Sequence, residues 1–246
     1  MLPVETVVRI LDPPGRSLRS SKKRPLLTSS IPRYVVRAGT TCWDASLVLA
    51  KYIERNVASL ADKHIVELGA GVSGLPGMAC ALLGAAHVVL TDMDGPVLSL
   101  LKKNVARNVS MAHVSMNGSA LNCRLARAPD VMELRWGECE DIARVIDRVD
   151  CIDYILAADC VYNEEAVGKL LDTILRLLEE KGKRTTKILV CNEYRSETVQ
   201  AEFLRRAAAA GLGPLKKEKE GSMHPEYKHE LIHIYKLKRI PCKRSP

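Results

Sequence analysis

The stretch KHIVELGAGVSGLPGMACALLGAAHVVLTD, residues 63–92, decides the fold class of this chain. It contains two apolar segments, 63–71 and 86–92, separated by a glycine-rich turn and a helical pattern at 74–85. Strands that are apolar throughout, and that alternate with helices, are typical of a parallel sheet whose two faces are both covered. The stretch therefore predicts the first β-α-β unit of an α/β domain.

The rest of the chain repeats this alternation and predicts one doubly wound α/β domain over residues 40–240. The domain is predicted to contain helices at 40–56, 95–108, 164–182 and 196–211, strands at 131–136, 154–159, 186–194 and 229–238, and a polar loop at 109–130. Two short alternating segments, 4–11 and 33–37, predict a small N-terminal β extension with a basic linker, residues 1–39. Residues 241–246 are predicted to form a basic tail.

The composition is that of a globular protein, since 47% of the 246 residues are hydrophobic and 27% are charged. No apolar run approaches membrane-spanning length, and none of the eight cysteines forms a C-x-x-C pair. We therefore expect a cytoplasmic or nuclear protein that binds no membrane. The net charge of +8 lies largely in segments 16–24 and 236–246, which are typical of solvated tails, so we expect no nucleic-acid partner.

The ends of the predicted strands carry the candidate site, because ligands of doubly wound sheets bind at the carboxyl ends of the strands. Gly69 and Gly71 lie in the turn after the first strand, where glycine lets the backbone approach a ligand closely. Asp92 ends the second strand, about 20 residues further on, where a carboxylate accepts hydrogen bonds from ribose hydroxyls. Together these residues predict an adenosine-type cofactor. The alternatives are a glycine turn without a ligand and a helix N-cap at Asp92.

Charge and aromatic residues at the same edge narrow the choice of cofactor. Glu67 precedes the glycine turn and would repel a pyrophosphate, which disfavours an NAD-dependent oxidoreductase, whereas S-adenosylmethionine brings a sulfonium and an ammonium group. Trp136, at the end of the third predicted strand, would stack on adenine or pack in the core. Trp43 would line the same pocket or pack in the core.

A match to the zinc-protease pattern H-E-x-x-H occurs at residues 229–233, HELIH. That pattern binds zinc on a helix, whereas the segment HELIHIYKLK alternates and predicts a strand. In a strand the two histidines would lie about 13 Å apart, at roughly 3.3 Å per residue. We therefore expect no catalytic metal.

Four segments resemble the methyltransferase-like 21 family of protein lysine methyltransferases, whose signature is Asp-x-x-Tyr after the fourth strand: ELGAG (67–71), TD (91–92), ELRWGE (133–138) and AADCVYNEE (157–165). The resemblance implies a seven-stranded, Rossmann-like class I methyltransferase fold that uses S-adenosylmethionine and releases S-adenosylhomocysteine. It implies cofactor contacts from Trp43, Gly69, Ala70, Gly71, Asp92, Trp136 and Ala158. The turn GAGVSGLPG has one residue more than the usual form in the family, so contacts beyond Gly71 are not transferred.

Within the family, the chain is most similar to the members that methylate valosin-containing protein, a AAA-type ATPase. This similarity includes VVRILD (7–12) and HPEYKHELIHIYKLKR (224–239). It implies a protein substrate, either valosin-containing protein or a chaperone, and a monomeric enzyme. The alternatives are a methyltransferase for a small molecule or another nucleophile, and a catalytically silent adaptor that binds S-adenosylmethionine.

The resemblance also places Asp159 and Tyr162 on the family's signature positions. Asp159 would attract and orient the lysine ammonium, and Tyr162 would give an aromatic wall for a cation that grows with each methyl group. Proton loss to water is as compatible with this arrangement as proton loss to Asp159. Glu193 and Arg195 either line the same rim or form a structural ion pair.

Overall fold

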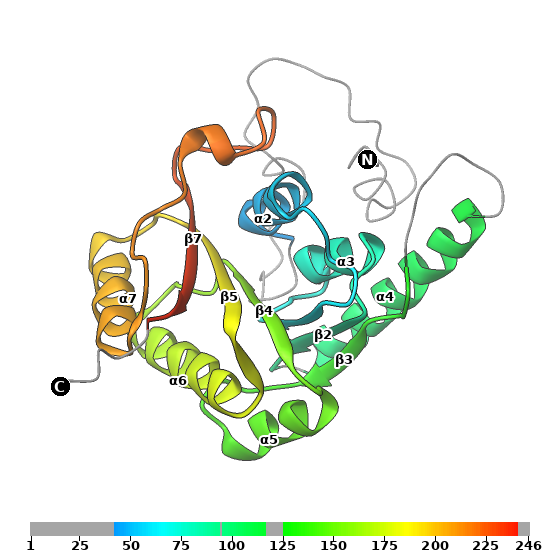
Figure 1. Ribbon diagram of the computed structural model, residues 1–246, viewed down its shortest axis with the longest axis horizontal. Coiled ribbons are helices and arrows are strands. Elements are labelled where there is room, and N and C mark those ends of the chain that lie inside the picture. Colours follow the sequence, from blue (N-terminus) through cyan, green and yellow to red (C-terminus); the bar gives the residue numbers. More distant parts are fainter. Residues whose placement is uncertain (1–41, 94, 117–124, 241–246) are drawn as a thin grey trace.

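The computed structural model describes residues 42–93, 95–116 and 125–240 (Figure 1). The predicted N-terminal extension and the tail at 241–246 lie outside these ranges and stay predictions. The described residues form a seven-stranded sheet in the order β3-β2-β1-β4-β5-β7-β6. Its strands are β1 (His64–Leu68), β2 (His87–Asp92), β3 (Asp130–Glu133), β4 (Ile152–Ala158), β5 (Gly182–Glu193), β6 (Leu212–Gly213) and β7 (Ile232–Arg239).

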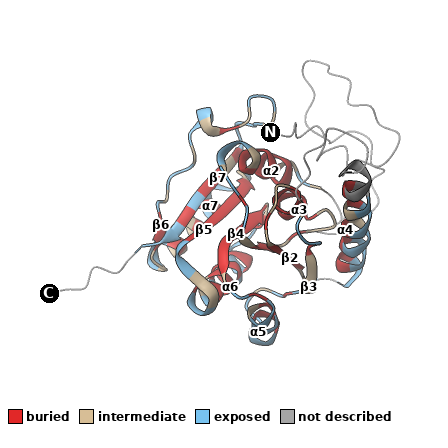
Figure 2. Ribbon diagram, turned by 45° about the vertical axis from the view of Figure 1, so that its right-hand side comes forward, coloured by how far each residue is buried: buried red, intermediate tan, exposed pale blue. Residues whose placement is uncertain are grey.

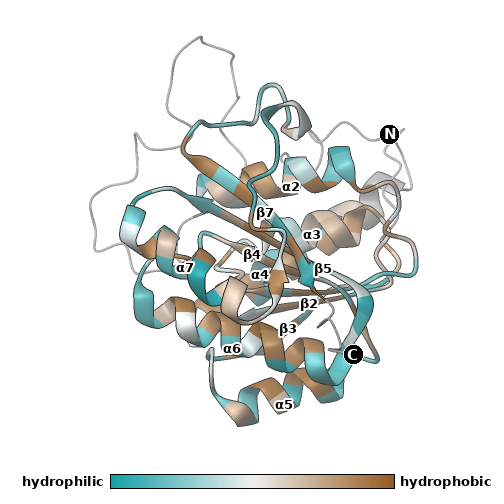
Figure 3. Ribbon diagram, turned by 60° about the vertical axis from the view of Figure 1, so that its left-hand side comes forward, coloured by the Kyte–Doolittle hydropathy of each residue, from teal (hydrophilic) through white to brown (hydrophobic). Residues whose placement is uncertain are grey.

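Helices cover both faces of this sheet. They are α2 (Asp44–Asn56), α3 (Leu75–Leu82), α4 (Gly95–Met116), α5 (Cys139–Arg148), α6 (Glu164–Lys181) and α7 (Glu197–Ala209), with a short 3-10 helix η1 (Glu220–Ser222). Helices α2 and α3 lie on one side of the strands, and α5, α6 and α7 lie on the other (Figure 3). None of the described helices combines the length and the apolar character needed to cross a membrane.

The central strands are buried on both faces, which explains their uninterrupted apolar sequence (Figure 2). Val66 and Leu68 pack in the cluster that includes residues of α5, α6 and α7, whereas Ile65 packs in the cluster of α2, α3 and α4. Every residue of β4 is buried. The predicted doubly wound α/β sheet is therefore confirmed.

Two helices differ from the expectation. The helix predicted at 95–108 continues to Met116, because Ala112 is fully buried in a cluster with residues of α2 and α3. Helix α5 was not predicted, although Ile142 and Val145 have helical spacing and are both buried. These apolar positions recur with clear helical periodicity, so this helix could have been predicted from the sequence.

The last strand differs from the parallel arrangement that the alternation predicted. Strand β7 runs antiparallel to both β5 and β6. The segment between β6 and β7 contains the 3-10 helix η1 but no α-helix. A parallel return needs a long crossover, usually through a helix, whereas an antiparallel return does not. The strand predicted at 229–238 begins at Ile232.

Helix α3 lies close to β1 and β2, and Gly77 makes this approach possible. A Cβ atom on Gly77 would lie 2.3 Å from Leu90 Cδ2 and 2.6 Å from Glu67 Oε2. The N–H of Gly77 donates a hydrogen bond to the same Glu67 oxygen at 2.7 Å. A side chain at position 77 would therefore push the helix away from the sheet.

We predict that Gly77→Ala destabilises the protein by about 1–3 kcal/mol, the usual cost of overpacking a core. This loss outweighs the gain in helix propensity of about 1 kcal/mol that alanine brings. The measurement is urea unfolding followed by circular dichroism. Gly95→Ala is the matched control, because no atom lies within 4 Å of a Cβ at that helical position. Equal stabilisation by both substitutions would contradict the packing role of Gly77.

Candidate active site

The loop after β4 carries the predicted signature residues in a fixed conformation. Asp159 has a φ of +58°, a left-handed conformation that Asp tolerates better than most residues. Its N–H donates to the Cys191 carbonyl oxygen at 2.7 Å, and the N–H of Val161 donates to Asn192 Oδ1 at 3.0 Å. The end of β5 thus holds the loop between β4 and α6. Strained backbone of this kind is concentrated at functional sites.

The carboxylate of Asp159 is covered by Arg195. The Asp159 side chain is 3% exposed, and Arg195 Nη2 lies 2.7 Å from its Oδ2 atom. The same guanidinium pairs with Glu193 and lies over the Trp43 ring, with its Cζ 5.1 Å from the ring centroid. The ion pair considered for Glu193 and Arg195 is therefore present, and it extends to Asp159.

A further acid lies near this ion-pair network. Asp44 is the first residue of α2, next to Trp43. Burial raises the pKa of Asp44 to about 6, and the nearby carboxylates of Glu193 and Asp159 contribute to the shift. This side of the site is thus dominated by carboxylates, with Arg195 as the cation that binds two of them.

Tyr162 and Trp136 lie together beside the glycine turn. Their ring centroids are 6.3 Å apart at a tilt of 39°, and Tyr162 is 51% exposed. A Cβ atom on Gly69 would lie 3.0 Å from the Trp136 ring and 2.8 Å from Cys160 Sγ. Trp136 also packs partly against the core on the α5–α7 side. Trp136 therefore lies beside the glycine turn and also packs against the core.

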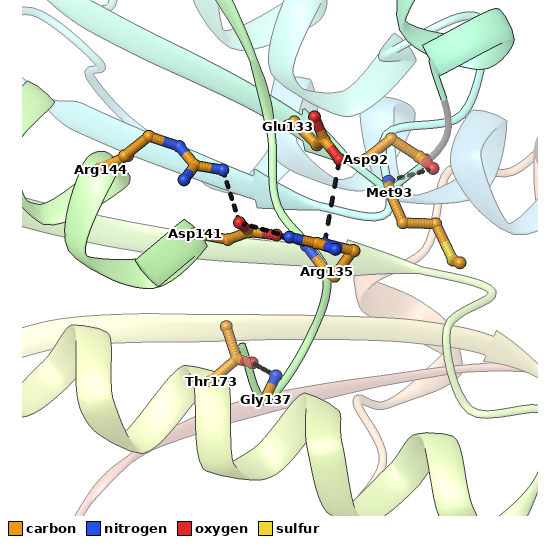
Figure 4. Close-up of polar contacts among 8 residues, drawn as sticks. All are labelled: Asp92, Met93, Glu133, Arg135, Gly137, Asp141, Arg144 and Thr173. Carbon is orange, nitrogen blue, oxygen red and sulfur yellow. Dashed lines mark hydrogen bonds and ion pairs between the residues drawn. The ribbon is translucent and has the colours of Figure 1, made fainter. Parts of the chain in front are cut away.

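Polar contacts fix the chain on both sides of Trp136 (Figure 4). Arg135 donates to both carboxylate oxygens of the buried Asp141, at 2.7 and 3.0 Å, and lowers the pKa of Asp141 well below its usual range. The N–H of Gly137 donates to Thr173 Oγ1 at 2.9 Å. Since β3 ends at Glu133, these contacts rather than strand pairing position the indole.

The glycine turn is tied to the end of β2. Gly69 and Gly71 have φ values of +65° and +59°, which favour glycine. The N–H of Gly71 donates to Asp92 Oδ2 at 2.8 Å, and the N–H of Ala70 donates to the Thr91 carbonyl oxygen at 2.9 Å. Asp92 is half-buried, and its other oxygen, Oδ1, accepts the N–H of Met93 at 2.8 Å. A carboxylate oxygen can accept more than one hydrogen bond.

These groups fit an adenosine cofactor that carries positive charge. The turn offers glycine backbone, Asp92 offers a carboxylate, and Trp136 offers an aromatic surface, all following the ends of neighbouring strands. Ala158, the last residue of β4, is buried beside Asp159. None of the predicted cofactor contacts is a basic residue that would neutralise a pyrophosphate. The assignment of these residues as cofactor contacts stays a prediction.

The structure does not confirm the expectation that Glu67 presents a negative charge to the cofactor. Its side chain is buried, and its carboxyl group accepts the N–H of Gly77 in α3. Burial raises the pKa of Glu67 to about 8, so the group is mostly protonated at neutral pH. Glu67 therefore shapes the packing of α3 on the sheet, and it does not present an exposed negative charge to a cofactor.

The H-E-x-x-H match does not lie on a helix. His229 precedes β7 and His233 lies within it. Across residues 42–93, 95–116 and 125–240, no group of three His, Cys, Asp or Glu side chains is arranged to hold a metal ion.

Sequence comparison identifies relatives of this chain. The sequence profile of a family described as lysine methyltransferase matches residues 35–210. A protein N-lysine methyltransferase METTL21A from Danio rerio is 38% identical over 155 residues, 63% of this chain and 61% of the relative. A protein-lysine methyltransferase METTL21E from Bos taurus is 36% identical over 65% of this chain and 49% of the relative. An EEF1A lysine methyltransferase 3 from Xenopus tropicalis is 29% identical over 80% of this chain and 73% of the relative.

The chain thus spans about half to three-fifths of the length of the first two of these curated relatives. Solved structures with low identity share the fold. A Methanococcus jannaschii fibrillarin pre-rRNA processing protein aligns with a TM-score of 0.54 and 12% identity, over 81% of this chain and 76% of its own. The METTL16 methyltransferase domain aligns with a TM-score of 0.50 and 14% identity, over 79% of this chain and 65% of its own. These likenesses confirm the predicted Rossmann-like class I methyltransferase fold.

We predict that Glu67→Gln changes how stability depends on pH. Because the pKa of Glu67 is raised to about 8 in the folded state, its protonated form stabilises the protein at low pH, and this contribution is lost as the pH rises toward 8. Glutamine keeps an acceptor for the Gly77 N–H and does not titrate. The free energy of unfolding of the variant, relative to that of the wild type, should therefore increase by about 1.4 kcal/mol for each unit that the pH rises between 5 and 8.

The measurement is urea unfolding at several pH values. Glu164→Gln, at an exposed position at the start of α6, is the control and should leave the pH dependence unchanged. A variant curve parallel to the wild-type curve would show that Glu67 is not protonated in the folded protein.

Proposed function

The chain belongs to the lysine methyltransferase family, and on that premise we propose that it transfers a methyl group from S-adenosylmethionine to a lysine amine of a protein substrate. One observation carries the proposal most directly. Gly69, which follows β1, and Cys160, which follows Asp159 after β4, approach closely enough that a Cβ on Gly69 would lie 2.8 Å from Cys160 Sγ. The proposed cofactor turn and the proposed substrate loop thus meet at one point.

The reaction needs an uncharged amine in line with the methyl carbon. When bound, S-adenosylmethionine supplies a methyl group on a positively charged sulfur, which departs as the neutral thioether of S-adenosylhomocysteine. A lysine ammonium, with a pKa near 10.4, must first lose one proton to water. Asp159 then orients the amine, and Tyr162 provides an aromatic surface for the cation that forms.

The protein substrate is proposed from two similarities. The resemblance in residues 7–12 and 224–239 favours valosin-containing protein, with a chaperone as the second choice. A relative named for EEF1A aligns over 80% of this chain at 29% identity, so EEF1A is a further candidate to test. We propose that the enzyme works as a monomer in the cytoplasm or the nucleus, without a nucleic-acid or membrane partner.

We predict that Asp159→Asn lowers kcat/KM for the protein substrate at least 100-fold, because the amide cannot attract the ammonium ion. Asparagine tolerates the left-handed backbone at this position, so the fold should be retained. The assay is transfer of labelled methyl groups to purified valosin-containing protein, a chaperone and EEF1A, and to cell extract. Affinity for S-adenosylhomocysteine, measured by calorimetry, should stay within about threefold of the wild type, because Asp159 is not one of the predicted cofactor contacts.

The matched control is Asp150→Asn, the same substitution at an exposed position before β4, at the opposite end of the strand. It should leave transfer unchanged. Label found only in small molecules would contradict the proposal of a protein substrate. Cofactor binding without methyl transfer would favour the catalytically silent adaptor. Full activity of Asp159→Asn would show that Asp159 is not needed for the reaction.

A further inference from the structure

The ion pair over Asp159 raises a question about how a lysine reaches that carboxylate. The side chains of Arg195 and Glu193 are 42% and 39% exposed, whereas that of Asp159 is 3% exposed. A lysine that arrives from solvent therefore meets the guanidinium before the carboxylate. Arg195 must shift to let an ammonium group reach Asp159.

The contacts of Arg195 allow a shift without complete release. Its Nη2 atom lies 2.7 Å from Asp159 Oδ2 and also 2.7 Å from Glu193 Oε2. Its Nε atom donates to the same Glu193 oxygen at 2.9 Å, and its guanidinium also rests on the Trp43 ring. When the bond to Asp159 is exchanged for a bond from lysine, the other two contacts hold the positive charge of Arg195 beside the incoming amine.

The charge balance around this position depends on Arg195. Carboxylates approach from separate elements: Asp159 after β4, Glu193 at the end of β5 and Asp44 at the start of α2. Other charges lie nearby. Asp92 at the end of β2 raises the pKa of the neighbouring Tyr162, whereas Lys169 of α6 lowers it. His229, before β7, lowers the pKa of Asp44. Without Arg195, the carboxylates would favour a charged lysine, and the charged form cannot attack a methyl group.

We propose that Arg195 is a positioning residue that occupies Asp159 before the substrate binds and then, held by Glu193 and Trp43, keeps the target lysine in its uncharged, reactive form. This inference rests on the proposed function. In the step it assists, the lysine ammonium loses one proton to water, and the nitrogen lone pair forms the bond to the methyl carbon. The carbon–sulfur bond breaks with its electrons left on sulfur, and the methylated amine carries the positive charge. A nearby cation is a known way to activate a lysine amine.

The test is the pH dependence of kcat for Arg195→Gln, with the protein substrate identified by the labelling experiment. Loss of the positive charge should move the midpoint of the acidic limb up by about one pH unit, as expected for one charge near the protein surface. At neutral pH, kcat should fall about tenfold while KM falls, because the ammonium form binds better. Above the new midpoint, kcat should return to within about threefold of the wild-type value. Arg195→Lys, which keeps the charge, should restore most of the wild-type midpoint.

Arg148→Gln is the matched control. Arg148 is 43% exposed and pairs with Asp130 at 2.8 Å, at the opposite edge of the sheet. Its variant should leave the pH profile unchanged. An Arg195→Gln enzyme that loses activity equally at every pH, or keeps the wild-type midpoint, would overturn the inference while the proposed function stands. A wild-type protein that labels no protein would instead overturn the proposed function.

A measurement without turnover gives a second readout. In the presence of S-adenosylhomocysteine, n-butylammonium should bind Arg195→Gln several-fold more tightly than the wild type at pH 7, because the carboxylates have lost their partner cation. Equal or weaker binding would contradict the role of Arg195 as an occupant of the lysine position.

Discussion

The site depends on one constraint of the sheet, the pairing of β1 with β2 on one side and with β4 on the other. The chain leaves β1 toward β2 and β3 and then returns past it to β4. Helix α3 follows β1 and helix α6 follows β4, and the two helices pack on opposite faces of the sheet. A crevice for a ligand forms at such a reversal of strand order. The closeness of Gly69 to Cys160 follows from it, because each lies just beyond its strand.

The loops at this edge share a mode of support, since each is held by an element other than the strand it follows. The loop that carries Asp159 is bound by the end of β5 through Asn192, and the glycine turn is bound by the end of β2 through Asp92. The neighbours of Trp136 are bound by α5 and α6. Such cross-links let the edge keep strained backbone and closely spaced carboxylates, because the rigid sheet rather than the loop itself maintains the geometry.

The sequence predicted those features that depend on local pattern. Continuous apolar segments and the glycine turn were enough to predict β1, β2, β4 and the edge where the candidate residues gather. Features that depend on tertiary contact were missed. Glu67 reads as a site acid until the packing of α3 shows where its carboxyl group points. Arg195 and Asp159 lie 36 residues apart, and their contact follows only from the pairing of β4 with β5. Helix α5 is a different case, because its apolar positions have clear helical spacing and it could have been predicted from the sequence.

Strand β7 gives the fold a fixed order of completion during synthesis. It follows β5 and β6 in the chain, yet it lies between them in the sheet. Until Ile232 and the residues after it leave the ribosome, β5 presents an unpaired edge that invites association with other chains. The Leu231 carbonyl oxygen that accepts the Tyr194 N–H at the end of β5 arrives with the same segment. A nascent chain therefore makes its glycine turn early and acquires the rim beside Arg195 last, when its exposed edge is also closed.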